Sequence, residues 1–356
     1  MPTSEEPAVF REALKKFRKR RVELDWEKLD APSEPRYAAL FAELHDLGVT
    51  SLALSEEDGG LALDVKSRVD IMRELGAGLP ALAYGLISHL TAVSLMRTAG
   101  ALSTSWLARL TAGARVAFAG NPLDASPETA FEVTAQGAPL LSGTQRLSLA
   151  YADLLLVPVK QGDQLKLCLL PVEQTGVRFD GGVSSHGLCL VPVGDLSFAD
   201  VRLSRGQLFA WPTNGDAAQE ADGLLTATLL GMVDEMAERA MRYALERYQG
   251  GKMIHEHDAV RQLVGPIELS RRVLEALALA TLEGARTGDG GSAAFAVELA
   301  RESGLDAVQT FGGWGYMEDY RVERYLRDAN TLETTWIHAA ARKRAIATTR
   351  FAELSS

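Results

Sequence analysis

Residues 243–257 decide the fold, and they read Tyr-Ala-Leu-Glu-Arg-Tyr-Gln-Gly-Gly-Lys-Met-Ile-His-Glu-His. They follow and partly overlap a segment whose apolar residues form two adjacent rows at helical spacing. The rows are Met232, Met236, Ala240, Ala244 and Val233, Ala237, Met241, Leu245. Charged residues fall on or beside the opposite face, so the segment is predicted to be an amphipathic helix.

The helical period continues toward the C-terminus. Further helices are expected at about 257–285, 292–311 and 336–353. Long helices joined by short connections are typical of an antiparallel bundle, so residues 213–356 are predicted to form a four-helix bundle.

The period differs on the N-terminal side of Pro212. Short apolar runs there are separated by Gly, Pro, Asp and Asn: Val116–Ala119, Phe131–Thr134, Leu154–Val159, Leu165–Leu170 and Leu188–Val193. They predict a β-domain with antiparallel pairing over residues 113–212.

Residues 1–112 are predicted to be a helical domain, with helical spacing in Phe10–Leu24, Tyr37–Leu47 and Val65–Leu75. The whole chain is therefore expected to be an α+β protein in three parts.

Composition narrows the class of protein. The chain has 356 residues, 47% of them apolar, and a net charge of −10. An acidic chain does not suit general nucleic-acid binding, and the basic run from Lys15 to Arg21 is interpreted as the solvated face of a first helix. No apolar stretch approaches the length of a membrane span. The first residues, Met-Pro-Thr-Ser-Glu-Glu, are acidic and lack the charged and apolar regions of a signal peptide. The two cysteines, Cys168 and Cys189, suit buried thiols in a reducing cytoplasm.

Four segments, in order along the chain, resemble acyl-CoA dehydrogenases. Leu47-Gly48-Val49 through Asp58-Gly59-Gly60, followed by Arg73-Glu74-Leu75-Gly76, is similar to "LG…PEEYGG…EELG". Ser142-Gly143-Thr144-Gln145 and Ala150-Tyr151-Ala152-Asp153 are similar to "NGxK…AxxAD".

The other two segments are the specific ones. Tyr243-Ala244-Leu245-Glu246-Arg247 through Glu256-His257 is similar to "YALERxxFGKxxxEHQ". Ala307-Val308-Gln309-Thr310-Phe311-Gly312-Gly313 through Arg327-Asp328-Ala329 is similar to "AVQxFGGxGY…RDA".

The resemblance implies FAD as the cofactor, with its nucleotide part against the bundle of a neighbouring subunit. The implied cofactor-binding residues are Arg247, Gln249, His257, Gln309, Gly312 and Gly313. Arg247 would supply a cation for the pyrophosphate, and the glycines would let backbone approach closely. Taken singly, Arg247 could instead pair with Glu246 or Glu238, and the glycines could be a helix C-cap.

The catalytic residues of the family are missing. The family's base, a glutamate just after "RDA", corresponds to Trp336, or to Ala339 in a register three residues longer. A second family location for the base corresponds to Leu224, beside Leu225. Trp336 cannot accept a proton, because an indole N–H only donates.

The middle domain departs from the family in two places. The usual Thr-Glu-Pro reads Gly120-Asn121-Pro122, and the usual Trp-Ile-Thr, which covers the flavin ring, reads Leu147-Ser148-Leu149.

Glu333 and Asp222 are weak substitutes for the base, and Asp222 could equally be a helix N-cap. His338, close to the lost base, is interpreted as structural. The pair His255 and His257 has no further ligands nearby, so a surface loop is favoured over a metal site, and no metal is expected.

Three functions remain open. The leading one is a base-less, flavin-sharing subunit of a heteromeric α2β2 acyl-CoA dehydrogenase, as in bacterial steroid degradation. Its partner would be a second dehydrogenase-type chain that carries the glutamate and binds acyl-CoA, with electron-transfer flavoprotein as acceptor. The alternatives are a self-sufficient dehydrogenase with a relocated base and a non-enzymatic binding protein.

Overall fold

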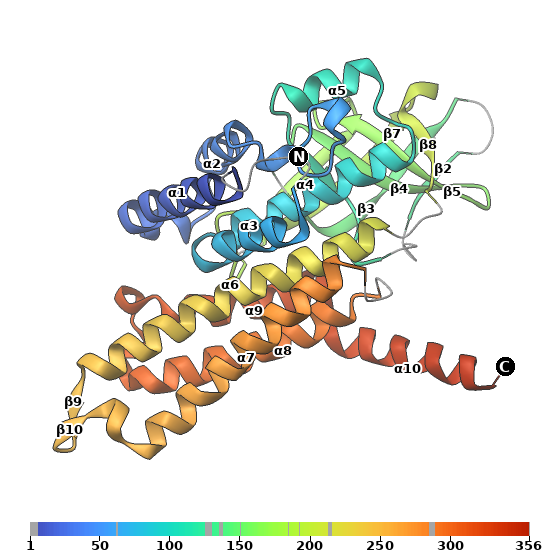
Figure 1. Ribbon diagram of the computed structural model, residues 1–356. Helices are drawn as coiled ribbons and strands as arrows, with labels where there is room; N and C mark the ends of the chain where they lie inside the picture. The colour runs from blue at the N-terminus through green and yellow to red at the C-terminus, as the bar shows by residue number, and fades with distance from the viewer. Residues whose placement is uncertain are drawn as a thin grey trace.

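The computed structural model describes residues 6–61, 63–124, 130–134, 138–149, 151–183, 185–191, 193–212, 216–284 and 289–355. Figure 1 shows N-terminal helices and a sheet above a bundle of long C-terminal helices. The predicted α+β class with its three parts is confirmed. No helix in these ranges is long and apolar enough to cross a membrane.

The N-terminal part is helical, as predicted. Its helices are α1 (Glu6–Leu29), α2 (Glu34–Asp46), α3 (Val65–Gly78), α4 (Pro80–Thr98) and α5 (Thr104–Thr111), with the 3-10 turns η1 (Val49–Ser51) and η2 (Glu56–Asp58). The α1 basic run is only partly solvated, because Arg18 donates to Glu74 of α3 and Glu235 of α6.

Helix α4 is the centre of this part. Every residue from Pro80 to Met96 is buried. Two of its polar side chains are satisfied by backbone: Ser88 accepts the Phe118 N–H, and the His89 ring accepts the Val116 N–H. These bonds fasten the first strand of the sheet to α4.

The middle part is an eight-stranded sheet. Its strands are β1 (Val116–Phe118), β2 (Phe131–Val133), β3 (Leu140–Leu149), β4 (Leu154–Gln161), β5 (Gln164–Pro171), β6 (Val177–Val183), β7 (Val193–Arg202) and β8 (Leu208–Ala210), with the turn η3 (Arg205–Gln207) before β8. The order is β6-β7-β3-β2-β4-β5-β8, with β1 also paired to β4. Most neighbours are antiparallel, but β1 and β2 each run parallel to β4, which the prediction of antiparallel pairing missed.

The predicted strand Leu188–Val193 is wrong over its first residues. Residues 188–191 form a buried turn, and β7 begins only at Val193. The Leu188 N–H donates to the buried Asp328 carboxylate, and the Gly187 N–H donates to the Thr331 hydroxyl. Bonds to the bundle thus replace the ladder bonds that a strand would require.

The C-terminal part contains α6 (Asp216–Glu246), α7 (Asp258–Leu282), α8 (Gly291–Phe311), α9 (Val322–Leu332) and α10 (Ala339–Ser355). A hairpin of β9 (Tyr248–Gln249) and β10 (Lys252–Met253) and the turn η4 (Ile254–Glu256) join α6 to α7. The turns η5 (Gly312–Tyr316) and η6 (Glu318–Tyr320) precede α9, and a π-helical turn, η7 (Glu333–Ile337), follows it.

Helix α9 was not predicted, and the last helix begins at Ala339 rather than 336. Helix α10 packs on α8 near its start and then extends away from the bundle, where Figure 1 shows it in red.

Helices α3 and α6 cross with their backbones in close contact. A Cβ on Gly76 would lie 2.0 Å from the Thr228 carbonyl oxygen, and one on Gly231 would lie 1.9 Å from the Arg73 carbonyl oxygen. Only glycine fits at these two positions, because any side chain would overlap backbone of the other helix. The elements change type between Thr111 and Val116 and between Ala210 and Asp216, so we propose domain divisions near residues 112 and 212.

Candidate functional site

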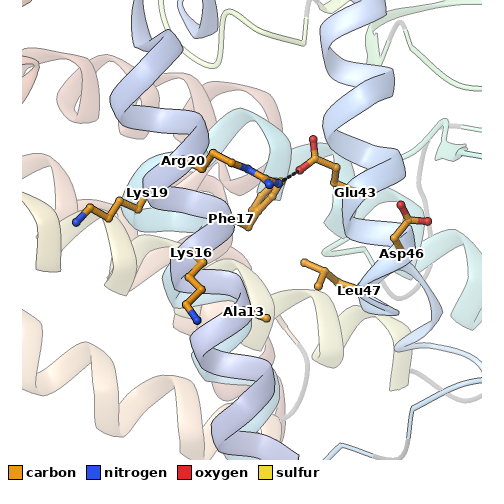
Figure 2. Close-up of a pocket in the computed structure, with 8 residues that line it drawn as sticks. All are labelled: Ala13, Lys16, Phe17, Lys19, Arg20, Glu43, Asp46 and Leu47. Atoms are coloured by element: carbon orange, nitrogen blue, oxygen red, sulfur yellow. Dashed lines mark hydrogen bonds and ion pairs between the residues drawn. The ribbon is translucent and has the colours of Figure 1, made fainter.

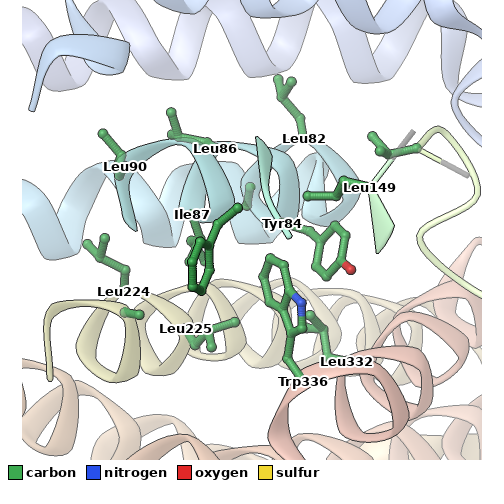
Figure 3. Packing of buried hydrophobic residues seen from close by; sticks show 14 of the residues in the cluster. Leu82, Tyr84, Leu86, Ile87, Leu90, Leu149, Leu224, Leu225, Leu332 and Trp336 are labelled. Atoms are coloured by element: carbon green, nitrogen blue, oxygen red, sulfur yellow. The ribbon is translucent and has the colours of Figure 1, made fainter. Parts of the chain in front are cut away.

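Trp336, which the sequence resemblance predicts at the position of the family's base, lies in the π-helical turn η7, between α9 and α10. There Trp336 is 4% exposed, and its ring stacks on that of Tyr84 from α4, with centroids 3.7 Å apart and planes 24° from parallel. Figure 3 shows the two rings between α4 and α6. Two aromatic side chains therefore occupy the space at this position.

Aliphatic side chains surround the stacked rings. Leu224 and Leu225 of α6, Leu149 of β3 and Leu332 of α9 are all buried. Figure 3 shows Leu225, Leu149 and Leu332 near the two rings and Leu224 farther along α6, toward Leu90. The side chain of Leu147, also expected here, lies outside the described residues. None of the residues labelled in Figure 3 is an aspartate or a glutamate. They therefore include no carboxylate that could remove a proton from a substrate carbon.

Polar contacts hold the turn η7 against the loop after β1. The Asn121 side-chain amide donates to the Trp336 carbonyl oxygen at 2.8 Å, and its own carbonyl accepts the Leu123 N–H. Arg342 of α10 donates to the carbonyl oxygens of Ile337 and Leu123. Asn121, in the family's Thr-Glu-Pro position, thus bonds to the chain's own backbone.

Asp222 lies inside α6 and is completely buried. Its carboxylate accepts the N–H groups of Ser292 and Ala293, at 3.4 and 2.7 Å, in the first turn of α8. Burial raises the pKa of Asp222 to about 6, against the opposing effect of these two bonds. The carboxylate therefore stabilises the first turn of α8. The alternative that Asp222 is itself an N-cap residue is wrong, because it lies inside α6 and reaches another helix through its side chain.

Glu333 has a comparable structural contact. Its carboxylate accepts the Ala339 N–H at 3.2 Å, in the first turn of α10, and its carbonyl accepts the His338 N–H. His338 adopts a left-handed φ of 47° as the chain turns from η7 into α10. Glu333 thus stabilises this turn.

The residues implied for cofactor binding lie at the bundle end formed by the end of α6 and the end of α8. Tyr243 of α6 and Phe311 of α8 stack there, with centroids 4.3 Å apart. Arg247 lies one helical turn beyond Tyr243, and Gly312 follows Phe311 directly. The structure therefore brings the two specific sequence segments together, and Figure 1 shows the β9–β10 hairpin at this end.

Arg247 is exposed, and no carboxylate of the described residues pairs with its guanidinium. Its possible partner Glu238 instead binds Arg242, which lies on the same helix. A helix-surface ion pair with Glu238, the alternative role for Arg247, is therefore not formed.

The glycines of this end serve different purposes. Gly312 ends α8 with a φ of 61°, as the C-cap alternative expected. A Cβ on Gly315 would lie 2.5 Å from the Val308 carbonyl oxygen. Gly313 has no positive φ, and a Cβ there would meet nothing within 4 Å among the described residues. Packing within the described chain thus does not explain glycine at position 313, which leaves the backbone open to an outside group.

Gln249, His257 and Gln309 complete the set. A ring nitrogen of His257 bonds to the Gln249 carbonyl oxygen at 3.0 Å and steadies the β9–β10 hairpin. The side chains of Gln249 and Gln309 are exposed. A cation, two amides and bare glycine backbone at one surface fit the anionic and polar parts of a dinucleotide.

The structure adds contacts that the sequence did not indicate. Tyr84 and Asn121 touch Trp336 from more than 200 positions away in the chain. A groove of about 740 Å³ between α1 and α2, lined by Phe17, Leu47 and charged residues, shares no residue with either site (Figure 2). Sequence pattern offered no sign of the Tyr84 contact, because α4 is buried on all sides and shows no amphipathic period.

Comparison with known proteins identifies the family. The family model of the acyl-CoA dehydrogenase N-terminal domain matches residues 4–114, and that of the C-terminal domain matches residues 221–335. A probable acyl-CoA dehydrogenase of Bacillus subtilis is 25% identical over 366 residues, covering 93% of this chain and 94% of the relative.

Solved structures share the fold. Butyryl-CoA dehydrogenase from Megasphaera elsdenii superposes with a TM-score of 0.78 at 21% identity, covering 99% of both chains. A variant of the steroid ACAD Tcur3481-Tcur3483 gives 0.79 at 18% identity, again over 99% of both chains. With both domain models matched in order around a sheet and bundle of this kind, the chain belongs to the acyl-CoA dehydrogenase family.

Proposed function

We propose that this chain is the non-catalytic, flavin-sharing subunit of an FAD-dependent acyl-CoA dehydrogenase built from two kinds of chain, with α2β2 stoichiometry. The complex introduces a double bond between the α and β carbons of an acyl-CoA. The partner chain carries the glutamate base and binds the substrate. This chain contributes residues to the nucleotide end of the partner's cofactor.

The observation that carries the proposal is the stack of Trp336 on Tyr84. It fills the space where the family's base meets the reacting carbon. Leu224, Leu225 and Leu149 remove the polar groups expected nearby, and Asn121 bonds Trp336 rather than a ligand. Both substitute carboxylates, Asp222 and Glu333, are engaged as helix caps.

The opposite end of the bundle supports the shared flavin. When bound, FAD supplies the hydride acceptor of the reaction. Arg247 would neutralise pyrophosphate oxygens, and the Gln309 amide can donate and accept at a polar edge of the cofactor. Gly313 leaves room for the cofactor beside the backbone. These residues bind and orient the nucleotide end, and none of them moves a substrate proton.

The setting follows from the same proposal. A shared cofactor requires a second subunit, and electron-transfer flavoprotein would accept the electrons. A steroid side chain or ring is a suitable acyl group, since the fold is shared with the steroid ACAD Tcur3481-Tcur3483. The two designations joined in that name fit an enzyme built from two kinds of chain. Free thiols at Cys168 and Cys189, whose pKa burial raises to about 12 and about 11, suit a cytoplasmic setting.

The test is the flavin spectrum of the purified chain, alone and co-expressed with a candidate partner, an acyl-CoA dehydrogenase chain that carries the family's glutamate. We expect little FAD with the chain alone and a full complement in the complex, with acyl-CoA oxidation only there. Stoichiometric FAD and activity in the chain alone would instead establish a self-sufficient enzyme. FAD in neither preparation would favour a non-enzymatic binding protein.

A further inference from the structure

An exposed aromatic side chain lies next to the bundle end that carries Arg247. Trp314, in the 3-10 turn η5, is 48% exposed, although tryptophan usually buries most of its surface. The neighbouring Tyr316 and Met317 are exposed as well. We propose that Trp314 is the adenine platform of this chain, stacking on the purine ring of FAD. The assignment rests on the shared flavin proposed above.

The indole is held in place by the structure around it. Its backbone carbonyl accepts the Met317 N–H, and the backbone of Gly315 beside it packs closely on Val308, where a Cβ would lie 2.5 Å from the Val308 carbonyl oxygen. One side of the indole contacts the Tyr320 ring, at a centroid distance of 5.7 Å. A ring fixed in this way loses little conformational entropy when a planar ligand stacks on its exposed surface.

Trp314 and Arg247 belong to the same end of the bundle. Tyr320 also contacts Tyr243, at 6.0 Å, and Tyr243 lies one helical turn before Arg247. Ring contacts through Tyr320 and Tyr243 thus connect Trp314 to the helical turn that carries Arg247, an exposed cation that pairs with no carboxylate of the described residues. Gly313, with nothing around its missing Cβ among the described residues, lies beside it. An aromatic plane, a cation and open backbone together suit a base attached to phosphates.

The proposal predicts a specific pattern of affinities. Base stacking on an aromatic side chain contributes enough for Trp314→Leu to weaken FAD and ADP binding about tenfold or more. FMN carries no adenine, so its affinity should not change. Trp314→Phe, which keeps a smaller ring, should fall between the wild type and the leucine variant. The matched control is Tyr316→Leu. Tyr316 is more exposed than Trp314, but its ring contacts no other aromatic ring of the described residues.

The experiment uses the co-expressed complex, stripped of flavin and titrated with FAD, FMN and ADP, with complex assembly followed by sedimentation. The expected result is a selective loss of FAD and ADP affinity in Trp314→Leu, with Tyr316→Leu close to the wild type. Wild-type FAD and ADP affinity in Trp314→Leu would overturn the platform while leaving the shared flavin intact.

Two further outcomes would also overturn the platform. Loss of assembly in Trp314→Leu, with FAD affinity unchanged in whatever complex remains, would make this surface a protein contact instead. A wild-type complex that binds neither FAD nor ADP would overturn both the platform and the proposed function.

Discussion

The ring of Trp336 lies 3.7 Å from that of Tyr84, centroid to centroid, with both side chains almost completely buried. The two residues come from opposite ends of the chain, α4 and the turn after α9. Their stack joins the N-terminal helices to the bundle at the position that the sequence resemblance assigns to the family's base, and there we propose that it takes the place of a catalytic site. The site therefore acts here as part of the hydrophobic core.

If the stack is core, then shortening Trp336 should leave a cavity. Trp336→Ala is expected to lower the free energy of unfolding by about 3–5 kcal/mol, because a large buried ring is lost and its surroundings relax only partly. Trp336→Phe keeps a ring against Tyr84 and should cost less. The measurement is urea unfolding followed by circular dichroism. An alanine variant as stable as the wild type would mean that the ring does not fill this space in solution.

Tyr84 should behave differently from Trp336. Its hydroxyl is buried and has no well-formed hydrogen bond within the described structure, and burial raises the pKa of Tyr84. Tyr84→Phe keeps the stacked ring and removes only the unsatisfied group. The variant should therefore match the wild type or exceed its stability by up to about 1 kcal/mol. A loss of more than this in thermal or urea unfolding would reveal a partner for the hydroxyl.

Arg247 should matter for flavin and little for folding. In the assembled complex, Arg247→Ala should weaken FAD binding by about 1.5–3 kcal/mol, the usual contribution of a charge-assisted contact. The control is Arg242→Ala, on the same helix and exposed, whose guanidinium is paired with Glu238. Flavin release on dilution, followed by fluorescence, measures both variants. Equal FAD affinity in the two would show that the resemblance has been over-read at this position.

His89 should make stability depend on pH. It is fully buried in α4, accepts the Val116 N–H and bonds to the Thr50 carbonyl, with His45 and Asp153 as its charged neighbours. Burial lowers its pKa to about 4, from an ordinary value of about 6.5. The unfolded chain therefore takes up a proton before the folded one does. This contribution to stability is present above about pH 6.5 and is lost as the pH falls toward 4, by about 3 kcal/mol in all.

The comparison with His89→Gln isolates this effect. Asp222, with a raised pKa of about 6, contributes with the opposite sign: its share of stability is present at low pH and is lost as the pH rises through 6. That slope is common to both proteins and cancels in the difference. Urea unfolding at pH 7, 6 and 5 should show the gap between wild type and variant changing in favour of the variant as the pH falls. A constant gap would contradict a neutral buried His89.

Much of the fold could be predicted because amphipathic helices and short apolar strands leave a period in the sequence. Helix α4 could not, since it is buried on every side and has no period. Strand β3 was missed because Ser142, Gly143 and Thr144 are polar or small, and all three are exposed. Residues 188–191 were wrongly predicted as a strand for the opposite reason. The run is apolar and buried, but the backbone N–H groups at its start donate to Asp328 and Thr331 rather than to a neighbouring strand.

The candidate site divides in the same way. The positions of Arg247 and Gln309 followed from segments that resemble the family, and their nearness rests on the Tyr243 and Phe311 stack. The contacts of Tyr84 and Asn121 with Trp336 join residues distant in sequence, which neither period nor spacing encodes. Asp222 and Glu333 were seen as carboxylates in the sequence, but their structural contacts were not predicted. Asp222 binds an N–H group of α8, which is distant in sequence, and Glu333 binds the N–H of Ala339 at the start of the next helix.

The two carboxylates give the sharpest test of catalysis. Glu333→Gln keeps an oxygen that can accept the Ala339 N–H, so the turn into α10 should remain and the complex should assemble with its FAD. Asp222→Asn keeps one acceptor for the first turn of α8 and loses the other. It should cost about 1 kcal/mol of stability, as for a weakened helix cap. Since neither group meets substrate in the proposed arrangement, acyl-CoA oxidation by the complete assembly should stay near the wild-type rate in both.

The partner's glutamate, changed to glutamine, is the matched variant and should abolish turnover while flavin content is kept. If instead Glu333→Gln or Asp222→Asn stopped oxidation in an intact, FAD-loaded complex, the base would belong to this chain, and Trp336 would be a wall of a working site rather than its replacement.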